Sequence, residues 1–175
     1  KATFESGLQV RYDATKNTEL SFTQNRTLIT QPIRNGNIQE LNAGVFAEEK
    51  LFLNPKLELT AGIRGDYFAN SYEDQLAQNK LSSSSFIVSP KLNINYKVNN
   101  DIQLYWYNGK GFHSNDTRVA VQKDGRDVVT PALGTDVGAI FKLGKKAMLQ
   151  TAFWYLWMEQ EFVYVGDAGV IEPGG

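Results

Sequence analysis

The sequence contains no cysteine and one histidine, His113, among its 175 residues. Without cysteine there is no disulfide framework, no thiol nucleophile and no cysteine-based zinc site. A lone histidine leaves no histidine cluster for a catalytic metal. No apolar run reaches the roughly 18 residues that a transmembrane helix requires. These absences exclude thiol chemistry and a membrane span made of helices.

The sequence also has no excess of positive or of negative charge. Lys plus Arg total 18 and Asp plus Glu total 19, so the net charge is −1. This balance argues against a nucleic-acid partner, because such proteins usually carry a basic excess. The start of the sequence has no initiating methionine and no apolar signal segment. Residues 1–5 have the pattern of a strand interior, so we expect an excerpt of a longer protein.

Alternation of apolar and polar residues is the dominant pattern, whereas helical spacing is rare. In residues 56–67, Leu59, Ile63 and Tyr67 share one face, and Arg64 and Asp66 share the other. This period of two is typical of a β-strand. The same alternation occurs in residues 86–96, 102–107, 136–143 and 149–157. The sequence therefore predicts an all-β fold.

Turn signals of two kinds separate the alternating segments. Short ones are expected at residues 13–18, 54–55, 98–100 and 143–146, and long ones at 30–37, 69–84 and 113–133. Asn, Gly and Pro in the short segments are suited to tight turns. Because short and long connections alternate, we expect about eight strands in an antiparallel up-and-down meander.

Strand length indicates a membrane barrel. The alternation persists over roughly 12 residues, and at a tilt near 45° such a strand rises roughly 28 Å. This height matches the apolar band of outer-membrane barrels, about 25 Å. Tyr67, Phe86, Phe112 and Trp157 each lie twelve or thirteen residues from a short turn. We interpret them as an aromatic girdle, so the sheet is expected to be part of a transmembrane β-barrel.

Three motifs then carry a family resemblance. The sequence G-I-R-G-D-Y-F occupies residues 62–68, S-P-K-L occupies 89–92, and L-Y-W-Y-N-G-K-G-F occupies 104–112. In this order and spacing they resemble strands of TonB-dependent outer-membrane receptors. Residues 149–161 are similar to a later strand of the same barrel.

The resemblance implies a 22-stranded barrel with a plug domain in its lumen, in the outer membrane of a Gram-negative bacterium. Such receptors bind a scarce nutrient, such as a ferric siderophore or a similar chelate, and import it with energy delivered by TonB. Residues 1–175 would then form one partial β-barrel domain of about eight strands. The plug domain, through which TonB acts, is not among them, and outer-membrane lipid would surround the wall.

Two loop-side segments are the candidates for ligand contact. The motifs G-F-H-S-N-D (residues 111–116) and V-G-D-A-G (165–169) resemble those of a receptor subgroup, and binding residues concentrate in loops. The polar candidates are His113, Asn115, Asp116, Asp167 and Glu172. A lone histidine where a strand meets a loop is more often a polar loop residue than a ligand. No catalytic residue, metal site or cofactor is expected, and the protein is not expected to be an enzyme.

Two alternatives remain open at this point. Eight strands can close into a small outer-membrane barrel, such as an adhesin or a lipid-modifying enzyme. In that barrel, residues 2–13 would pair with residues 147–165. The second alternative is a soluble β-sandwich that binds carbohydrate, although it lacks the Cys…Trp…Cys core of the immunoglobulin fold.

Overall fold

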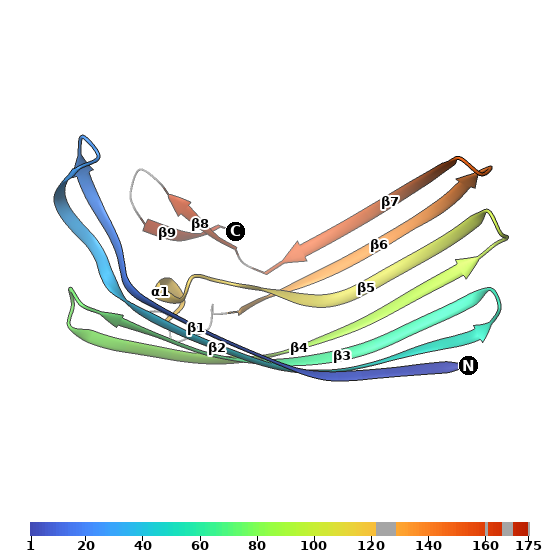
Figure 1. Ribbon diagram of the computed structural model, residues 1–175, viewed down its shortest axis with the longest axis horizontal. Coiled ribbons are helices and arrows are strands. Elements are labelled where there is room, and N and C mark those ends of the chain that lie inside the picture. Colours follow the sequence, from blue (N-terminus) through green and yellow to red (C-terminus); the bar gives the residue numbers. More distant parts are fainter. Residues whose placement is uncertain (122–128, 160, 166–169, 175) are drawn as a thin grey trace.

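The computed structural model describes residues 1–121, 129–159, 161–165 and 170–174. Seven strands form one sheet (Figure 1): β1 (Ala2–Gln24), β2 (Leu28–Asn54), β3 (Leu57–Asp74), β4 (Asn79–Lys97), β5 (Ile102–Ser114), β6 (Val129–Leu143) and β7 (Ala147–Met158). A short helix, α1 (Thr117–Ala120), follows β5. A separate two-stranded sheet consists of β8 (Glu161–Val165) and β9 (Val170–Gly174). No helix in the described part of the chain is long and apolar enough to cross a membrane.

The large sheet is an antiparallel meander in which each strand pairs with the next along the chain. It curls into a half-barrel with β1 and β7 at its two edges (Figure 1). The predicted all-β meander and barrel wall are confirmed. The sheet has seven strands, with β8 and β9 apart from it, where about eight were expected. Because β1 does not pair with β7, the described residues do not form a small closed barrel, and one curled sheet is not a sandwich.

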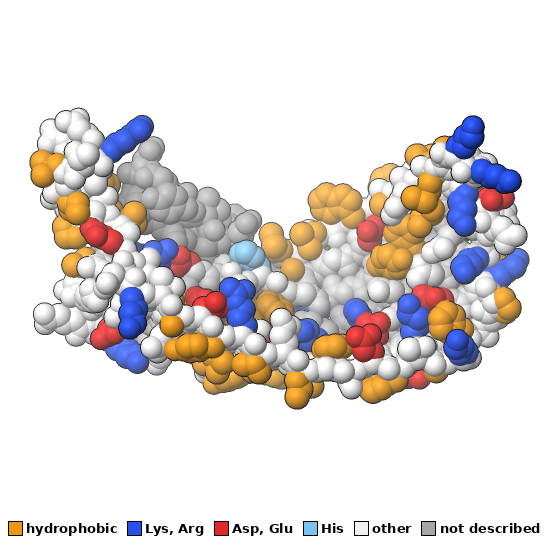
Figure 2. Space-filling model, in the orientation of Figure 1, with side chains coloured by type: hydrophobic (Ala, Val, Ile, Leu, Met, Phe, Trp, Pro, Cys, Tyr) orange, Lys and Arg blue, Asp and Glu red, His pale blue; other side chains and the backbone are white. Residues whose placement is uncertain are grey.

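The two faces of the sheet differ as the alternation predicts. On the convex side Leu8, Val10 and Phe153 expose 84%, 72% and 89% of their surface, and apolar side chains line this edge in Figure 2. On the concave side Asp66 is fully buried and Phe68 is 8% exposed. Directly paired residues of antiparallel neighbours point to the same face, so this division extends across the sheet.

One group of turns lies where the sequence predicts it. The strands reverse at residues 55–56, 98–101 and 144–146, which we call the short-turn end of the half-barrel. Side chains stabilise two of these turns locally. The Asn54 Oδ1 accepts hydrogen bonds from the backbone N–H groups of Lys56 and Leu57, and Asn99 does the same for Asp101 and Ile102. Such Asx turns need only local sequence.

At the opposite end the strands are much longer than predicted. Residues 13–18 and 30–37, expected as turns, lie within β1 and β2, and most of 69–84 belongs to β3 and β4. Strands β1 and β2 are 23 and 27 residues long instead of about 12. Polar sequence continues as a strand here because a paired ribbon in water does not need an apolar face. Register shifts near Thr15, Leu20 and Phe22 accommodate the extension.

The end of β5 leaves β4 and enters the concave side. Pairing with β4 stops at Gly109, whereas pairing with β6 continues to Ser114. Here α1 packs on β2 and β3. Phe68, Ile87, Ala120 and Val129 form a buried cluster against which Phe112 packs.

Part of the predicted aromatic girdle is therefore wrong. Tyr67 and Phe86 are direct cross-strand partners with 44% and 66% exposure, as expected at one height of the outer face. Phe112, by contrast, packs edge-to-face on the buried Phe68, with ring centroids 5.3 Å apart. The inward departure of β5 beyond Gly109 explains this placement.

Candidate functional site

The concave face holds the charged side chains that sequence patterning assigns to the lumen. Its ion pairs are Arg11–Asp13, Lys50–Glu58, Arg64–Asp66, Lys91–Glu48 and Arg118–Asp116. A polar, internally paired inner surface is what a water-filled or protein-filled barrel requires.

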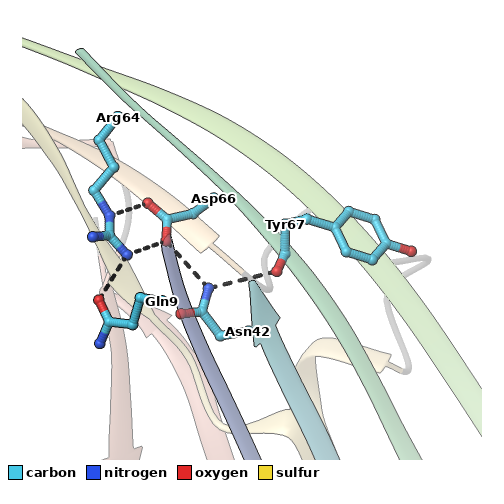
Figure 3. A network of polar contacts seen from close by, with 5 residues as sticks. All are labelled: Gln9, Asn42, Arg64, Asp66 and Tyr67. Atoms are coloured by element: carbon cyan, nitrogen blue, oxygen red, sulfur yellow. Dashed lines mark hydrogen bonds and ion pairs between the residues drawn. The ribbon is translucent and has the colours of Figure 1, made fainter. Parts of the chain in front are cut away.

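The most buried of these pairs joins two residues of β3 (Figure 3). Arg64 donates from Nε and Nη2 to the two carboxylate oxygens of Asp66, at 2.6 Å each. Arg64 Nη2 also donates to Gln9 on β1, and Asn42 on β2 donates to Asp66 at 3.3 Å. The Asp66 side chain has no exposed surface, whereas Arg64 keeps 30%. The network links β1, β2 and β3 through one buried carboxylate.

A second network lies on the concave face nearer the short-turn end. Asn95 donates to Glu58 at 3.3 Å and accepts from Gln103 and the Tyr107 hydroxyl at 3.1 and 2.9 Å. Lys50 completes it through the ion pair with Glu58, 3.5 Å long. The residues come from β2, β3, β4 and β5, so these contacts lock neighbouring strands side by side.

The segment between β5 and α1 is fixed by its own side chains. Asn115 is 7% exposed and donates to Thr130 at 3.0 Å. Asp116 accepts from the backbone N–H and the Nε of Arg118, at 2.9 Å each. Burial by itself raises the pKa of the Asp116 carboxyl, but the hydrogen bonds and charge of Arg118 outweigh it. The pKa therefore lies below its ordinary value.

Helix α1 is anchored to the wall at its first residue. Thr117 is 1% exposed, accepts from Asn70 at 2.9 Å and donates to Glu40. Arg34 donates to the Arg118 carbonyl at 3.4 Å. The anchors lie on β2 and β3, far away in the sequence, so the segment is held against the inner face.

A hollow of about 680 Å³ lies on the concave side over β5, β6 and β7. Gly109, Gly111 and Gly134 are among the residues that line it, and a β-carbon on Gly111 would meet no atom within 4 Å. Around them stand aromatic, charged and apolar side chains, including Lys91, Tyr107, Lys110, His113, Asp136, Trp154, Leu156 and Met158. Trp154 is 74% exposed on this concave side. Cavities that bind small molecules have similar volumes, about 300–1,000 Å³.

The structure separates the five residues predicted from the sequence. His113 lines the hollow, whereas Asn115 lines a different depression next to Phe68. The Asp116 carboxylate forms an ion pair with Arg118. Asp167 lies outside the described residues, and for Glu172 only the backbone, in β9, is described. Their places in the structure do not test whether these five residues contact a ligand, so that remains a prediction.

Sequence reasoning missed the residues that build the hollow. Tyr107 and Trp154 were not among the predicted ligand contacts, and only the pairing of β5, β6 and β7 brings them near His113. Within the described part of the chain, no group of three or more His, Cys, Asp or Glu side chains is arranged to hold a metal ion. The side chains that line the hollow are aromatic rings, which can stack on a ligand, and charged groups, which can pair with one.

An open antiparallel half-barrel with an apolar convex face and a polar concave face is the architecture of part of a membrane β-barrel wall. Residues 2–134 match the family described as TonB dependent receptor-like, beta-barrel. The match covers most of the chain, and the chain belongs to this family. TonB-dependent receptors are transport receptors of the Gram-negative outer membrane.

A solved structure agrees with this fold. The chain is similar to the ferric-catecholate import receptor Fiu of E. coli K12, with a TM-score of 0.60 and 16% sequence identity. The similarity covers 97% of this chain and 29% of the receptor, so the chain spans under a third of that receptor's length. At this identity the likeness concerns the fold alone. No curated protein matches the sequence.

Proposed function

We propose that this chain forms part of the barrel wall of an outer-membrane receptor that imports a scarce nutrient with energy from TonB. The observation that carries the proposal is the half-barrel with its polar, ion-paired inner face, in a chain that belongs to the receptor family. In this role the convex face contacts outer-membrane lipid and the concave face encloses the transport path.

The hollow over β5, β6 and β7 is the proposed ligand contact. Tyr107 and Trp154 supply aromatic surface, Lys110 supplies positive charge, and His113 supplies a polar edge. Lys91 also lines the hollow but is paired with Glu48. An anionic chelate with aromatic groups would satisfy all three kinds of side chain. A ferric catecholate, the cargo named for the similar receptor, is therefore the first ligand to test. Asn115 and Asp116 would position the neighbouring segment, with Asp167 and Glu172 kept as further predicted contacts.

Uptake of radioactive iron tests the function. Cells that lack their own catecholate receptors would express the intact protein, with and without functional TonB, and receive a ferric tricatecholate. We expect uptake only when both proteins are present. Uptake that does not depend on TonB would contradict the proposed coupling, and failure with a panel of chelates would contradict import of this ligand class.

Two neighbouring residues provide a matched test of the site. Trp154 faces the hollow, whereas Phe153 is 89% exposed on the opposite face. Trp154→Ala should lower ligand affinity by about tenfold, the loss expected for one stacked ring. Phe153→Ala should leave affinity unchanged. Equal effects of the two substitutions would remove the hollow from the ligand path.

A further inference from the structure

The short-turn end of the half-barrel carries a concentration of lysine. Lysines flank or occupy all three of its turns: Lys56, Lys97, Lys142, Lys145 and Lys146. Figure 2 shows basic side chains gathered at the right-hand end, where Figure 1 places the turns β2–β3, β4–β5 and β6–β7. The chain as a whole has a net charge of −1, so this end is positive relative to the rest of the chain.

The apolar convex surface extends as far as these turns. By strand alternation Leu53, Val98 and Leu143 lie on the convex face, one beside each turn, and they expose 59%, 37% and 58% of their surface. At a tilt near 45°, the part of β3 from Leu57 to Tyr67 rises roughly 23 Å, close to the apolar band of about 25 Å. With Tyr67 at one border of the band, the short turns lie at the other border, at the level of lipid headgroups.

The two borders of the apolar band differ in charge. Beyond the pair of Tyr67 and Phe86, the next convex positions of β2, β3 and β4 are uncharged: Gln39, Leu41, Ala69, Ser71, Ser82 and Ser84. Beside the short turns, the acidic residues are Asp101 and Glu58, and Glu58 already pairs with Lys50. None of the five lysines has an ion pair in the described part of the chain. Positive charge at the membrane border is therefore confined to the short-turn end, where it attracts anionic headgroups.

We propose that the short-turn end binds phospholipids whose headgroup carries a net negative charge, such as phosphatidylglycerol, in preference to zwitterionic ones. Lys145 and Lys146 contact the phosphate, because both are exposed in the β6–β7 turn directly after Leu143. Long lysine stems lie along apolar surface while the ammonium groups reach the headgroups. The other three lysines line one depression at the rim of the concave face and add to the positive potential. This inference rests on the proposed function only in placing the convex face in lipid, and it does not depend on the ligand or on TonB.

The lipid selectivity of the intact protein tests the inference. The protein is reconstituted in vesicles with equal amounts of phosphatidylglycerol and phosphatidylcholine and purified in a mild detergent, and mass spectrometry counts the lipids that stay bound. One lysine near an anionic membrane surface changes binding by about fivefold. Phosphatidylglycerol should therefore be enriched over phosphatidylcholine by about fivefold or more. Replacing Lys145 and Lys146 together by Gln should remove most of this enrichment, and replacing them by Arg should retain it.

Lys16 and Lys80 provide the matched control, because both are exposed lysines toward the opposite end of the strands. Replacing them by Gln should leave the enrichment unchanged, and an excess of soluble glycerol 3-phosphate should not displace the bound lipid. The inference is overturned if phosphatidylglycerol is not enriched, if the two pairs of Gln substitutions have equal effects, or if the soluble phosphate displaces the lipid. Recovery of the protein in the vesicles reports on membrane insertion and iron uptake reports on transport, so a failure of the proposed function is recognised separately.

Discussion

The buried carboxylate of Asp66 permits a sharp prediction about the stability of the wall. Replacing Arg64 by Met removes both 2.6 Å hydrogen bonds and leaves an unexposed carboxylate with Asn42, at 3.3 Å, as its remaining side-chain donor in the described structure. Breaking a buried ion pair from one side costs about 3–5 kcal/mol, because the other charge stays buried. We expect Arg64→Met to lower the free energy of unfolding by that amount.

The opposite replacement should be milder. In Asp66→Asn the remaining Arg64 is 30% exposed and keeps its bond to Gln9, so water solvates the cation. The expected loss is about 1.5–3 kcal/mol, the usual contribution of hydrogen bonds to a charged group. The double variant removes both charges and should be more stable than Arg64→Met alone.

Urea unfolding of the intact barrel in phospholipid vesicles measures these differences. Arg11→Met is the matched control, because Arg11 and Asp13 also lie two residues apart at 2.6 Å but expose 72% and 43% of their side chains. An exposed pair of this kind contributes about 0–1 kcal/mol. If Arg64→Met costs no more than Arg11→Met, or if the losses of the two single variants simply add in the double variant, the reasoning from burial is refuted.

Three further predictions follow from the same structure. Ile63→Arg places a charge on the lipid face and should cost about 2–4 kcal/mol in vesicle unfolding if it lies near the midplane; Ile63→Phe should cost little. Gly138→Ala should destabilise the barrel by about 1–3 kcal/mol, because its β-carbon would lie 2.3 Å from a backbone oxygen and a tyrosine hydroxyl. Gly111→Ala is its control, because a β-carbon there would meet no neighbouring atom. Equal losses of unfolding free energy in the two variants would contradict the close packing around Gly138. The pKa of Asp116 is lowered, so the stabilisation by Arg118 is present above pH 3.8 and is lost as the pH falls below it. The difference in unfolding free energy between wild type and Asp116→Asn should shrink as the pH falls below 3.8. A difference that does not change with pH would contradict a stabilising ion pair between Asp116 and Arg118.

The assignment of faces was available from the sequence because side chains alternate along any strand. Ile63 and Tyr67 face outward and Arg64 and Asp66 inward, as their spacing predicts. The short turns at Asn54 and Asn99 were likewise predictable, since each asparagine bonds its own neighbours. Neither feature depends on distant parts of the chain.

The extent of the strands required the three-dimensional structure. The segment 30–37 carries turn-forming residues, yet it continues β2 because β1 offers a partner along its length. At 69–84 the chain turns at 75–78, where the Asp74 carboxylate accepts from the N–H groups of Leu76 and Ala77. Local composition signals polarity here but cannot show whether a backbone partner is present.

The sequence by itself determined the class of fold, the inner and outer faces and the short-turn end, because strand alternation and Asx turns are local properties. Tertiary structure alone decided how the candidate site is built. The anchoring of Thr117 by Glu40 and Asn70 and the convergence of Lys56, Lys97 and Lys142 join residues far apart in the chain. Such contacts depend on strand register and on the inward turn of β5, which arise from the pairing of the whole sheet.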